Sequence, residues 1–327
     1  MIEVRELTKR FGDRIAVDGI SFEVRDGCVL ALVGTSGCGK STTLRMINRL
    51  VDPSSGEVMI DGRNALDMPL EQLRLGIGYV IQGIGLFPHW TVARNVATVP
   101  RLMGWERERI EARVSELLEL FQLDPGEFAG KYPSELSGGQ QQRVGVARAI
   151  AAEPAVLLMD EPFGALDPIT RQRLQAEFAA IQRRRRMTVI LVTHDMDEAF
   201  KLADTIAVMD EGRILQIASP EELLREPRQG FVRTLVGLDD RALRILSLHT
   251  VDEIRREPTG RWEVRGETLI DRESGRAVNG LGAGDTLREA ASRIIWEAVE
   301  TLPVLEAGSV VGEVRADDVW AAGGRRA

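Results

Sequence analysis

The chain has 327 residues, and its 50 acidic side chains outnumber its 42 lysines and arginines, giving a formal net charge of −8 at pH 7. This length favours two domains over one, and the acidic balance argues against a nucleic-acid partner. No run of about 18 apolar residues is present, so we expect no membrane-spanning helix. Two cysteines provide no disulfide framework, and residues 1–5 open on a strand-like pattern rather than a leader peptide.

The first 30 residues contain two strand-like segments, 2–7 and 20–24, which we expect to form an antiparallel edge. Phe11 follows the first segment. Its ring could stack on a nucleotide base, or it could pack in the hydrophobic core. The residues alone leave both interpretations open.

Residues 34–41 fit G-x-x-x-x-G-K-[ST], a loop whose backbone N–H groups bind phosphates. The apolar run 29–33 predicts a buried strand before the loop, and 42–50 predicts a helix whose N-terminus favours an anion. We expect Lys40 to reach the β- and γ-phosphates and Ser41 to ligate Mg²⁺. The flanking strand and helix argue against a chance glycine-rich turn. The predicted nucleotide-binding residues of this segment are Gly34, Thr35, Ser36, Gly37, Cys38, Gly39, Lys40, Ser41 and Thr42.

Gln82 follows a predicted strand at 78–81 and could contact Mg²⁺ or an attacking water. The next segment, 85–90, carries Leu86, Phe87 and Trp90 in a predicted loop. Such side chains either mark an interface or pack their own subdomain. Residues 92–99 and 107–121 then break the alternation of strand and helix with helical periodicity and many charges.

Residues 136–140, Leu-Ser-Gly-Gly-Gln, precede a helical pattern that runs to about residue 152. They therefore form a second helix N-terminus with exposed N–H groups. One chain has no need of two phosphate sites, whereas two chains packed head to tail do. We expect a two-fold homodimer in which Ser137, Gly138, Gly139 and Gln140 contact the nucleotide held by the partner.

The apolar run 155–159 ends in Asp160 and Glu161. Carboxylates at the C-terminal end of a parallel strand face the ligand crevice. Beside a phosphate loop, Asp160 is placed to hold Mg²⁺ and Glu161 to act as general base on the attacking water. Without that loop, two surface acids would be the favoured interpretation.

A basic run at 183–186 is expected to end a helix with a solvated face. The following apolar run, 189–193, is a predicted strand that ends at His194. This imidazole could hydrogen-bond the γ-phosphate and the catalytic water. The alternative is a capping or core histidine.

Together these segments resemble the nucleotide-binding subunits of ATP-binding cassette (ABC) transporters. The resemblance covers residues 1 to about 237. It identifies residues 34–41 as the Walker A motif and 156–161 as Walker B. The remaining motifs are the A-loop at Phe11, the Q-loop at Gln82, the signature at 136–140, the D-loop at 165–167 with Asp167 among the nucleotide-binding residues, and the switch histidine His194.

The resemblance implies an α/β fold, a P-loop cassette with a mainly parallel sheet core, an antiparallel edge and a helical subdomain at about 88–150, all within a domain of residues 1–240. It implies ATP and Mg²⁺ as cofactors and ATP hydrolysis with Glu161 as base. In this family Ser137 and Gly139 act in trans on the partner's ATP.

The partners implied by the resemblance are a second copy of the chain, transmembrane permease subunits and, indirectly, a solute-binding protein. Such a subunit lies peripherally on the cytoplasmic face of the inner (plasma) membrane. Residues 77–82 and 84–89 are most similar to importers of glycine betaine, choline, carnitine and related osmoprotectants, with Gly83 where that group usually has a second glutamine. The alternatives are an importer ATPase for another small solute and a soluble, non-transport ABC ATPase.

Residues 241–327 contain arginines but no lysine, which suggests a separate module. A helix at 285–298, strands at 301–305 and 310–314, and a short helix from 317 are predicted. This order resembles one cystathionine-β-synthase (CBS) repeat. It implies a small α+β regulatory or dimerisation domain at 241–327, with the weak strand signals of 247–284 as an incomplete partner repeat.

Overall fold

The computed structural model describes residues 1–83, 85–164, 166–228, 230–237, 239–265 and 268–324. The chain divides into two compact units, Met1–Ser219 and Pro220–Ala327. The observed boundary, after Ser219, lies earlier in the chain than the boundary between residues 240 and 241 that we expected from the sequence. The reason is that α10 (Pro220–Arg225) packs against α12 (Arg241–Leu248), which joins residues 220–240 to the second unit.

The central sheet of the first unit has six strands in the order β10-β9-β3-β8-β7-β6, and only β10 is antiparallel to its neighbour. Its middle strands are buried throughout, as expected for parallel strands covered on both faces. The strands are β3 (Val29–Gly34), β6 (Ile77–Val80), β7 (Val156–Asp160), β8 (Thr188–Thr193), β9 (Thr205–Asp210) and β10 (Arg213–Ala218).

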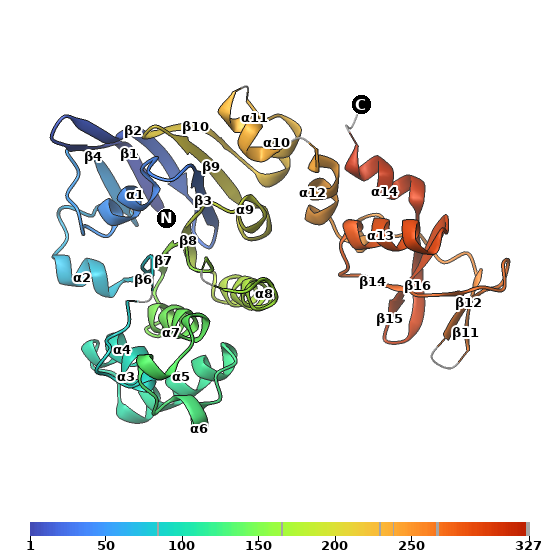
Figure 1. Cartoon of the computed structure of the whole chain (residues 1–327), viewed down its shortest axis with the longest axis horizontal. Helices are drawn as coiled ribbons and strands as arrows, with labels where there is room; N and C mark the ends of the chain where they lie inside the picture. Colours follow the sequence, from blue (N-terminus) through green and yellow to red (C-terminus); the bar gives the residue numbers. More distant parts are fainter. Residues whose placement is uncertain (84, 165, 229, 238, 266–267, 325–327) are drawn as a thin grey trace. The chain divides into compact units, whose positions relative to one another are not determined.

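The antiparallel strands expected near the N-terminus form a separate sheet in the order β2-β1-β4-β5. Helix α1 contacts strands of both sheets (Figure 1). Ile2, Leu44 and Ile190 belong to one buried cluster that includes residues of both sheets. The elements are β1 (Ile2–Phe11), β2 (Arg14–Val24), α1 (Lys40–Ile47), β4 (Ser55–Ile60), β5 (Arg63–Asn64), α2 (Leu70–Leu75), α8 (Pro168–Arg185) and α9 (Met196–Leu202).

Helices fill the stretch between β6 and β7 (Figure 1). The predicted helix at 107–121 is confirmed as α5, and the periodicity at 92–99 corresponds to two short helices. Helix α7 contacts both α3 and α5. The elements are α3 (Val92–Val96), α4 (Thr98–Leu102), α5 (Arg107–Leu120), α6 (Pro125–Phe128), the 3₁₀ turn Pro133–Glu135 and α7 (Gly138–Ile150).

The second unit is built on a three-stranded sheet, β14-β15-β16, whose buried side chains pack with those of α12, α13 and α14. The predicted helix–strand–strand–helix order of 285–323 is confirmed. The described residues between 251 and 284 instead form a 3₁₀ turn and short strands, without an α-helix of their own. The elements are α11 (Phe231–Val236), the 3₁₀ turn Val251–Glu253, β11 (Trp262–Arg265), β12 (Thr268–Asp271), β13 (Ala277–Val278), β14 (Leu281–Gly282), α13 (Leu287–Glu297), β15 (Thr301–Glu306), β16 (Ser309–Arg315) and α14 (Ala316–Gly323).

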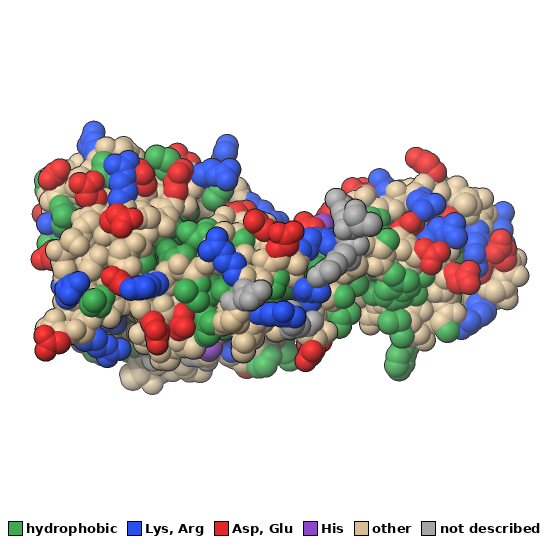
Figure 2. All heavy atoms as spheres, turned by 90° about the horizontal axis from the view of Figure 1, so that it is seen from above, with side chains coloured by type: hydrophobic (Ala, Val, Ile, Leu, Met, Phe, Trp, Pro, Cys, Tyr) green, Lys and Arg blue, Asp and Glu red, His purple; other side chains and the backbone are tan. Residues whose placement is uncertain are grey.

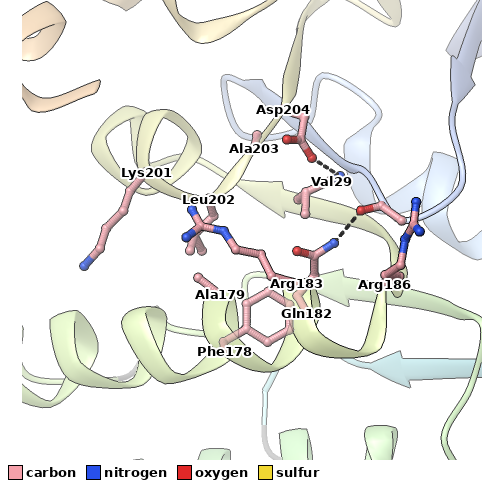
Figure 3. A pocket seen from close by; sticks show the side chains of 11 residues that line it. Val29, Phe178, Ala179, Gln182, Arg183, Arg186, Lys201, Leu202, Ala203 and Asp204 are labelled. Carbon is pink, nitrogen blue, oxygen red and sulfur yellow. Dashed lines mark hydrogen bonds between the residues drawn. The ribbon is translucent and has the colours of Figure 1, made fainter. Parts of the chain in front are cut away.

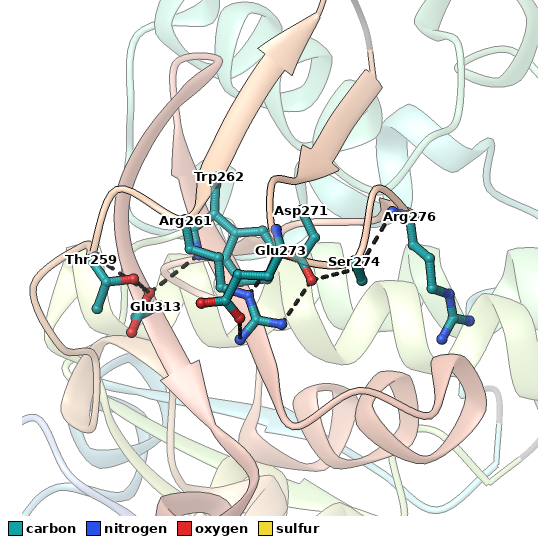
Figure 4. Close-up of polar contacts among 8 residues, drawn as sticks. All are labelled: Thr259, Arg261, Trp262, Asp271, Glu273, Ser274, Arg276 and Glu313. Atoms are coloured by element: carbon teal, nitrogen blue, oxygen red, sulfur yellow. Dashed lines mark hydrogen bonds and ion pairs between the residues drawn. The ribbon is translucent and has the colours of Figure 1, made fainter.

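A polar network holds the β11–β12 hairpin in place (Figure 4). Arg261 donates to both carboxylate oxygens of Asp271, at 2.8 and 2.7 Å, and these bonds hold the pKa of Asp271 well below its usual range. Glu313 of β16 accepts from the Trp262 indole at 3.2 Å and from the Thr259 hydroxyl at 2.9 Å. Asp271 and Glu313 are both buried, so these donors satisfy carboxylates that water does not reach.

The outer side of α13 carries Ile295 and Trp296, which are 69% and 88% exposed. Figure 2 shows hydrophobic side chains gathered at the surface of this unit. The opposite side of the same helix is buried through Leu287, Ala290 and Ile294, at helical spacing.

Candidate functional site

The phosphate loop joins β3 to α1, and its backbone conformation requires glycine at several positions. Gly34, Gly37 and Gly39 have φ of 152°, 79° and 108°. A Cβ on Gly34 would lie 2.1 Å from the Met209 carbonyl oxygen, and one on Gly39 would lie 2.5 Å from that of Ala16. The loop is therefore pressed against β2 and β9 with no room for side chains at these positions.

Lys40, the first residue of α1, folds back over this loop. Its Nζ donates to the carbonyl oxygens of Gly34 and Thr35, both at 2.8 Å, and lies 3.6 Å from the Cys38 sulfur. The side chain is 6% exposed. Neutral carbonyl partners leave a buried positive charge available to an anion.

Asp160 lies at the carboxyl end of β7, beside the first turn of α1. Its Oδ1 accepts a hydrogen bond from the Ser41 hydroxyl at 2.8 Å, while its buried Oδ2 has no partner in the described structure. Burial raises the pKa of Asp160, opposed by the bond from Ser41 and by the charge of Arg45. A buried carboxylate oxygen without a partner beside a serine hydroxyl is a donor set that fits Mg²⁺.

Glu161 occupies a strained position, with φ of 51°, a region uncommon for residues other than glycine. Gln82 Nε2 donates to its Oε2 at 3.4 Å, and His194 Nδ1 lies 3.3 Å from its Oε1. The histidine side chain is 64% exposed, and Asp195 supplies the N-cap of α9. His194 is therefore neither a core nor a capping residue. The fold therefore brings two predicted residues, Gln82 and His194, from separate segments to the carboxylate of Glu161.

A cavity of about 440 Å³ connects these groups. Phe11 is 51% exposed and lines it, so the core interpretation of this ring is wrong. Arg14 also lines the cavity and was not among the sequence candidates, although it lies only three residues beyond Phe11. The lining residues are Phe11, Arg14, Ala16, Ser36, Gly37, Gly39, Lys40, Ser41, Thr42, Gln82 and Glu161.

The segment 137–140 does not line this cavity. Ser137 is the N-cap of α7: its hydroxyl accepts from the Gln140 N–H at 3.3 Å, and the Gln140 side chain accepts from the Ser137 N–H at 2.8 Å. Ser137 and Gly138 are exposed, and Gly139 and Gln140 are half-buried. Within one chain this second helix N-terminus is therefore not part of the phosphate loop's cavity.

Asp167 is the exposed N-cap of α8 and accepts from the Thr170 N–H at 3.0 Å. This bond and that from the Thr170 side chain lower the pKa of Asp167. Asp167 is not among the residues that line the cavity either. Ala165 of the predicted D-loop lies outside the described residues, as does Ile84 of the segment before Phe87.

A second cavity of about 260 Å³ lies at the amino ends of β3 and β9 (Figure 3). Arg183, Arg186 and Lys201 supply its positive charge. The basic run ends α8 as predicted, because Arg186 is its left-handed C-cap. The expected solvated face is not purely solvent-exposed, because Arg185 forms an ion pair with Glu153 at 2.9 Å.

Comparison with known proteins identifies the family. A family model described as ABC transporter matches residues 17–164. The osmoprotectant import ATP-binding protein OsmV of Salmonella typhimurium is 50% identical over 79% of this chain and 69% of that protein. The glycine betaine uptake system ATP-binding protein YehX of Escherichia coli is 46% identical over 93% of this chain and 94% of that protein. The chain belongs to the ABC transporter family of ATP-binding proteins.

Solved structures confirm the P-loop cassette fold of this ABC protein. The dimeric structure of MJ0796, a bacterial ABC transporter cassette, has a TM-score of 0.63 at 32% identity, covering 71% of this chain and 100% of that one. A dimeric post-hydrolysis state of the same cassette, bound to ADP and Pi, has a TM-score of 0.62. None of the described helices combines the length and the hydrophobicity needed to cross a membrane.

In this ABC protein the loop 85–90, which carries Phe87 and Trp90, is held in place by Asn95, a residue that was not predicted from the sequence. Asn95, fully buried in α3, accepts from the Phe87 N–H at 2.8 Å and donates to the carbonyl oxygens of Phe87, Trp90 and Thr91, each at 3.1 Å. Phe87 remains 39% exposed, with its ring centroid 4.4 Å from that of Trp90. The sequence did carry a signal, because Asn95 lies three positions after Val92, at the spacing that puts both on one side of a helix.

Proposed function

We propose that this chain is the ATP-hydrolysing subunit of an ABC importer for quaternary amine osmoprotectants such as glycine betaine, choline or carnitine. One observation carries the hydrolytic assignment: the Glu161 carboxylate lies between Gln82 and His194 at the edge of the cavity lined by the phosphate loop. The solute class rests on the relatives that import osmoprotectants and glycine betaine.

In this proposal Lys40 exchanges its bonds to Gly34 and Thr35 for the phosphates of ATP, and Phe11 stacks on the adenine. Ser41, Gln82 and Asp160 hold Mg²⁺, which neutralises charge on the phosphates when it is bound. Glu161 accepts the proton of the attacking water, and Gln82 and His194 fix the orientation of its carboxylate.

The site is completed by a second copy. Ser137 to Gln140 and Asp167 lie outside the cavity of their own chain, so a head-to-tail homodimer would bring them to the partner's nucleotide. The dimeric cassettes with the same fold support this arrangement. Closure of two chains on ATP would then convert nucleotide binding into motion, because ATP binds the closed state more tightly.

The remaining partners follow from the importer assignment. We expect the exposed ring of Phe87 to contact a transmembrane permease, with the chain bound peripherally at the cytoplasmic face of the inner membrane and a solute-binding protein delivering the amine. The order β14-α13-β15-β16-α14 supports a CBS-like C-terminal unit with a regulatory or dimerising role.

Glu161→Gln tests the hydrolytic assignment. The variant should bind ATP as the parent does but lose turnover on the order of a hundredfold or more, because the amide cannot accept the proton. Glu71→Gln, on an exposed position of α2, is the matched control. A variant that hydrolyses ATP near the parent rate contradicts the assignment of the base.

The solute class requires the assembled importer. The chain, its permease and its binding protein, reconstituted in vesicles, should accumulate labelled glycine betaine only when ATP is supplied on the side of this subunit. Uptake of a sugar or a polyamine in place of a quaternary amine would contradict the solute class while leaving the ATPase assignment intact.

A further inference from the structure

Arg14 is a cation at the mouth of the nucleotide cavity that none of the sequence motifs accounts for. It begins β2 and pairs with Phe11 of β1 across the turn formed by Gly12 and Asp13. Residues that pair directly on antiparallel strands project to the same face of the hairpin. Both side chains accordingly line the same cavity.

The guanidinium of Arg14 lies over the phosphate loop. A Cβ added to Gly37 would be 3.9 Å from Arg14 Nη2. The cation that lies over the Phe11 ring is instead Lys9, with Nζ 5.0 Å from the ring centroid. Arg14 is therefore directed toward the phosphate loop.

Arg14 is exposed, and no hydrogen bond or ion pair engages its guanidinium in the described part of the chain. By contrast, Arg5 forms an ion pair with Glu3, and Arg213 forms one with Asp18. A planar guanidinium without a partner, facing a loop of backbone N–H groups, has the geometry that binds phosphate oxygens. Lys40 would then be only one of two cations at the phosphate chain.

We propose that Arg14 binds the phosphate chain of the nucleotide. The inference rests on the proposed function and adds a binding residue to it. The hairpin thereby places two determinants on one face: Phe11 for the base and Arg14 for the phosphates. Because their separation is set by a backbone pair, the hairpin favours nucleotides with a phosphate chain long enough to reach both.

The test measures equilibrium binding of ATP, ADP and adenosine, each with Mg²⁺, to the full-length chain. Arg14→Ala should weaken ATP binding on the order of tenfold, the usual effect of losing a charge-assisted hydrogen bond. Adenosine binding should not change, since it has no phosphate. Arg14→Lys should recover part of the loss. Arg10→Ala is the control, because Arg10 precedes Phe11 in β1 and does not line the cavity.

ATP affinity within twofold of the parent in Arg14→Ala overturns the inference, as does an equal loss for ATP and adenosine. Arg14→Gln, which keeps a hydrogen-bond donor without the charge, must weaken ATP binding as well. Lys40→Ala distinguishes a failure of this inference from a failure of the proposed function. If it loses ATP while Arg14→Ala retains it, only this inference fails. If Lys40→Ala binds ATP like the parent, the proposed function fails.

Discussion

The hydroxyl of Ser41 donates a 2.8 Å hydrogen bond to the carboxylate of Asp160, although the two residues are 119 positions apart in the chain. The bond joins the first turn of α1 to the end of β7, and so unites two motifs at one point. The second carboxylate oxygen of Asp160 is buried and has no partner among the described residues. This position is therefore unfavourable for a charged side chain until a cation arrives.

Asp160→Asn should stabilise the nucleotide-free chain at neutral pH while abolishing Mg²⁺-dependent hydrolysis. Burial raises the pKa of Asp160, so the folded state disfavours the carboxylate, and removing its charge should gain about 1–2 kcal/mol. Below the ordinary pKa of aspartate, about 3.9, the acid is neutral in both states and the gain should vanish. Thermal melts across this pH range measure it.

Asp67→Asn is the control for that experiment, because Asp67 is exposed and its replacement should leave the melting temperature unchanged. An Asp160→Asn chain that melts below the parent at neutral pH would contradict the argument. It would mean that the carboxylate is better satisfied than its contacts indicate.

Mixing two inactive variants tests whether the site is shared between copies. Lys40→Ala disables the phosphate loop, and Ser137→Arg disables the N-terminus of α7. Neither should hydrolyse ATP alone. In a heterodimer, the intact loop of the Ser137→Arg chain meets the intact serine of the other, so activity should return on mixing. Full activity of either variant alone, or no recovery despite heterodimer formation, would rule out the head-to-tail arrangement.

Asn95→Ala should loosen the loop that carries Phe87 and Trp90. The substitution leaves one N–H and three carbonyl oxygens without their buried partner, at a cost of roughly 2 kcal/mol in the free energy of unfolding. ATPase activity of the subunit alone should survive, whereas its stimulation by permease should fall. Asn64→Ala is the control, because the side chain of Asn64, at the end of β5, accepts a bond from the Leu66 N–H alone among the described contacts. Undiminished permease stimulation would show that the loop is not the coupling element.

The Arg261–Asp271 pair predicts a pH-dependent stability of the second unit. Asp271→Asn should lower the free energy of unfolding by roughly 1–3 kcal/mol, because it removes the charge from two hydrogen bonds. Since folding lowers the pKa of Asp271, this contribution is present above the pKa of unfolded aspartate and is lost as pH falls toward the folded value. Denaturant titrations at neutral and acidic pH measure it.

Glu273→Gln provides the matched comparison, since Glu273 is 71% exposed and contacts the same arginine at 3.1 Å. An exposed pair contributes little, so a change below about 0.5 kcal/mol is expected. Equal effects of the two substitutions would mean that burial does not distinguish the two carboxylates.

Much of the site could be predicted because phosphate binding places local demands on the chain. A glycine-rich loop between a buried strand and a helix, and a carboxylate pair after an apolar strand, are each visible within ten or so residues. Arg14 and Asn95 escaped prediction for the opposite reason. Their roles depend on what lies across from them, namely Gly37 for Arg14 and the Phe87 backbone for Asn95.

The fold was predictable to a similar degree. The apolar runs of β7 and β8 and the helical periodicity of α5 and α13 identified these elements directly. Two features could not be predicted from the sequence: the separate antiparallel sheet and the packing of α10 on α12. Short segments such as β5 carry too little periodicity to indicate which elements they contact.

By itself the amino-acid sequence determined the phosphate loop, the acidic strand end, the cassette family and the elements of the last 40 or so residues, because each depends on residues that are neighbours in the chain. Only the tertiary structure decided that Glu161 lies between Gln82 and His194, and that one oxygen of Asp160 has no partner in the part of the chain that is described. Those relationships depend on the order of the parallel strands in the sheet. That order is established by packing between side chains that lie far apart in the sequence.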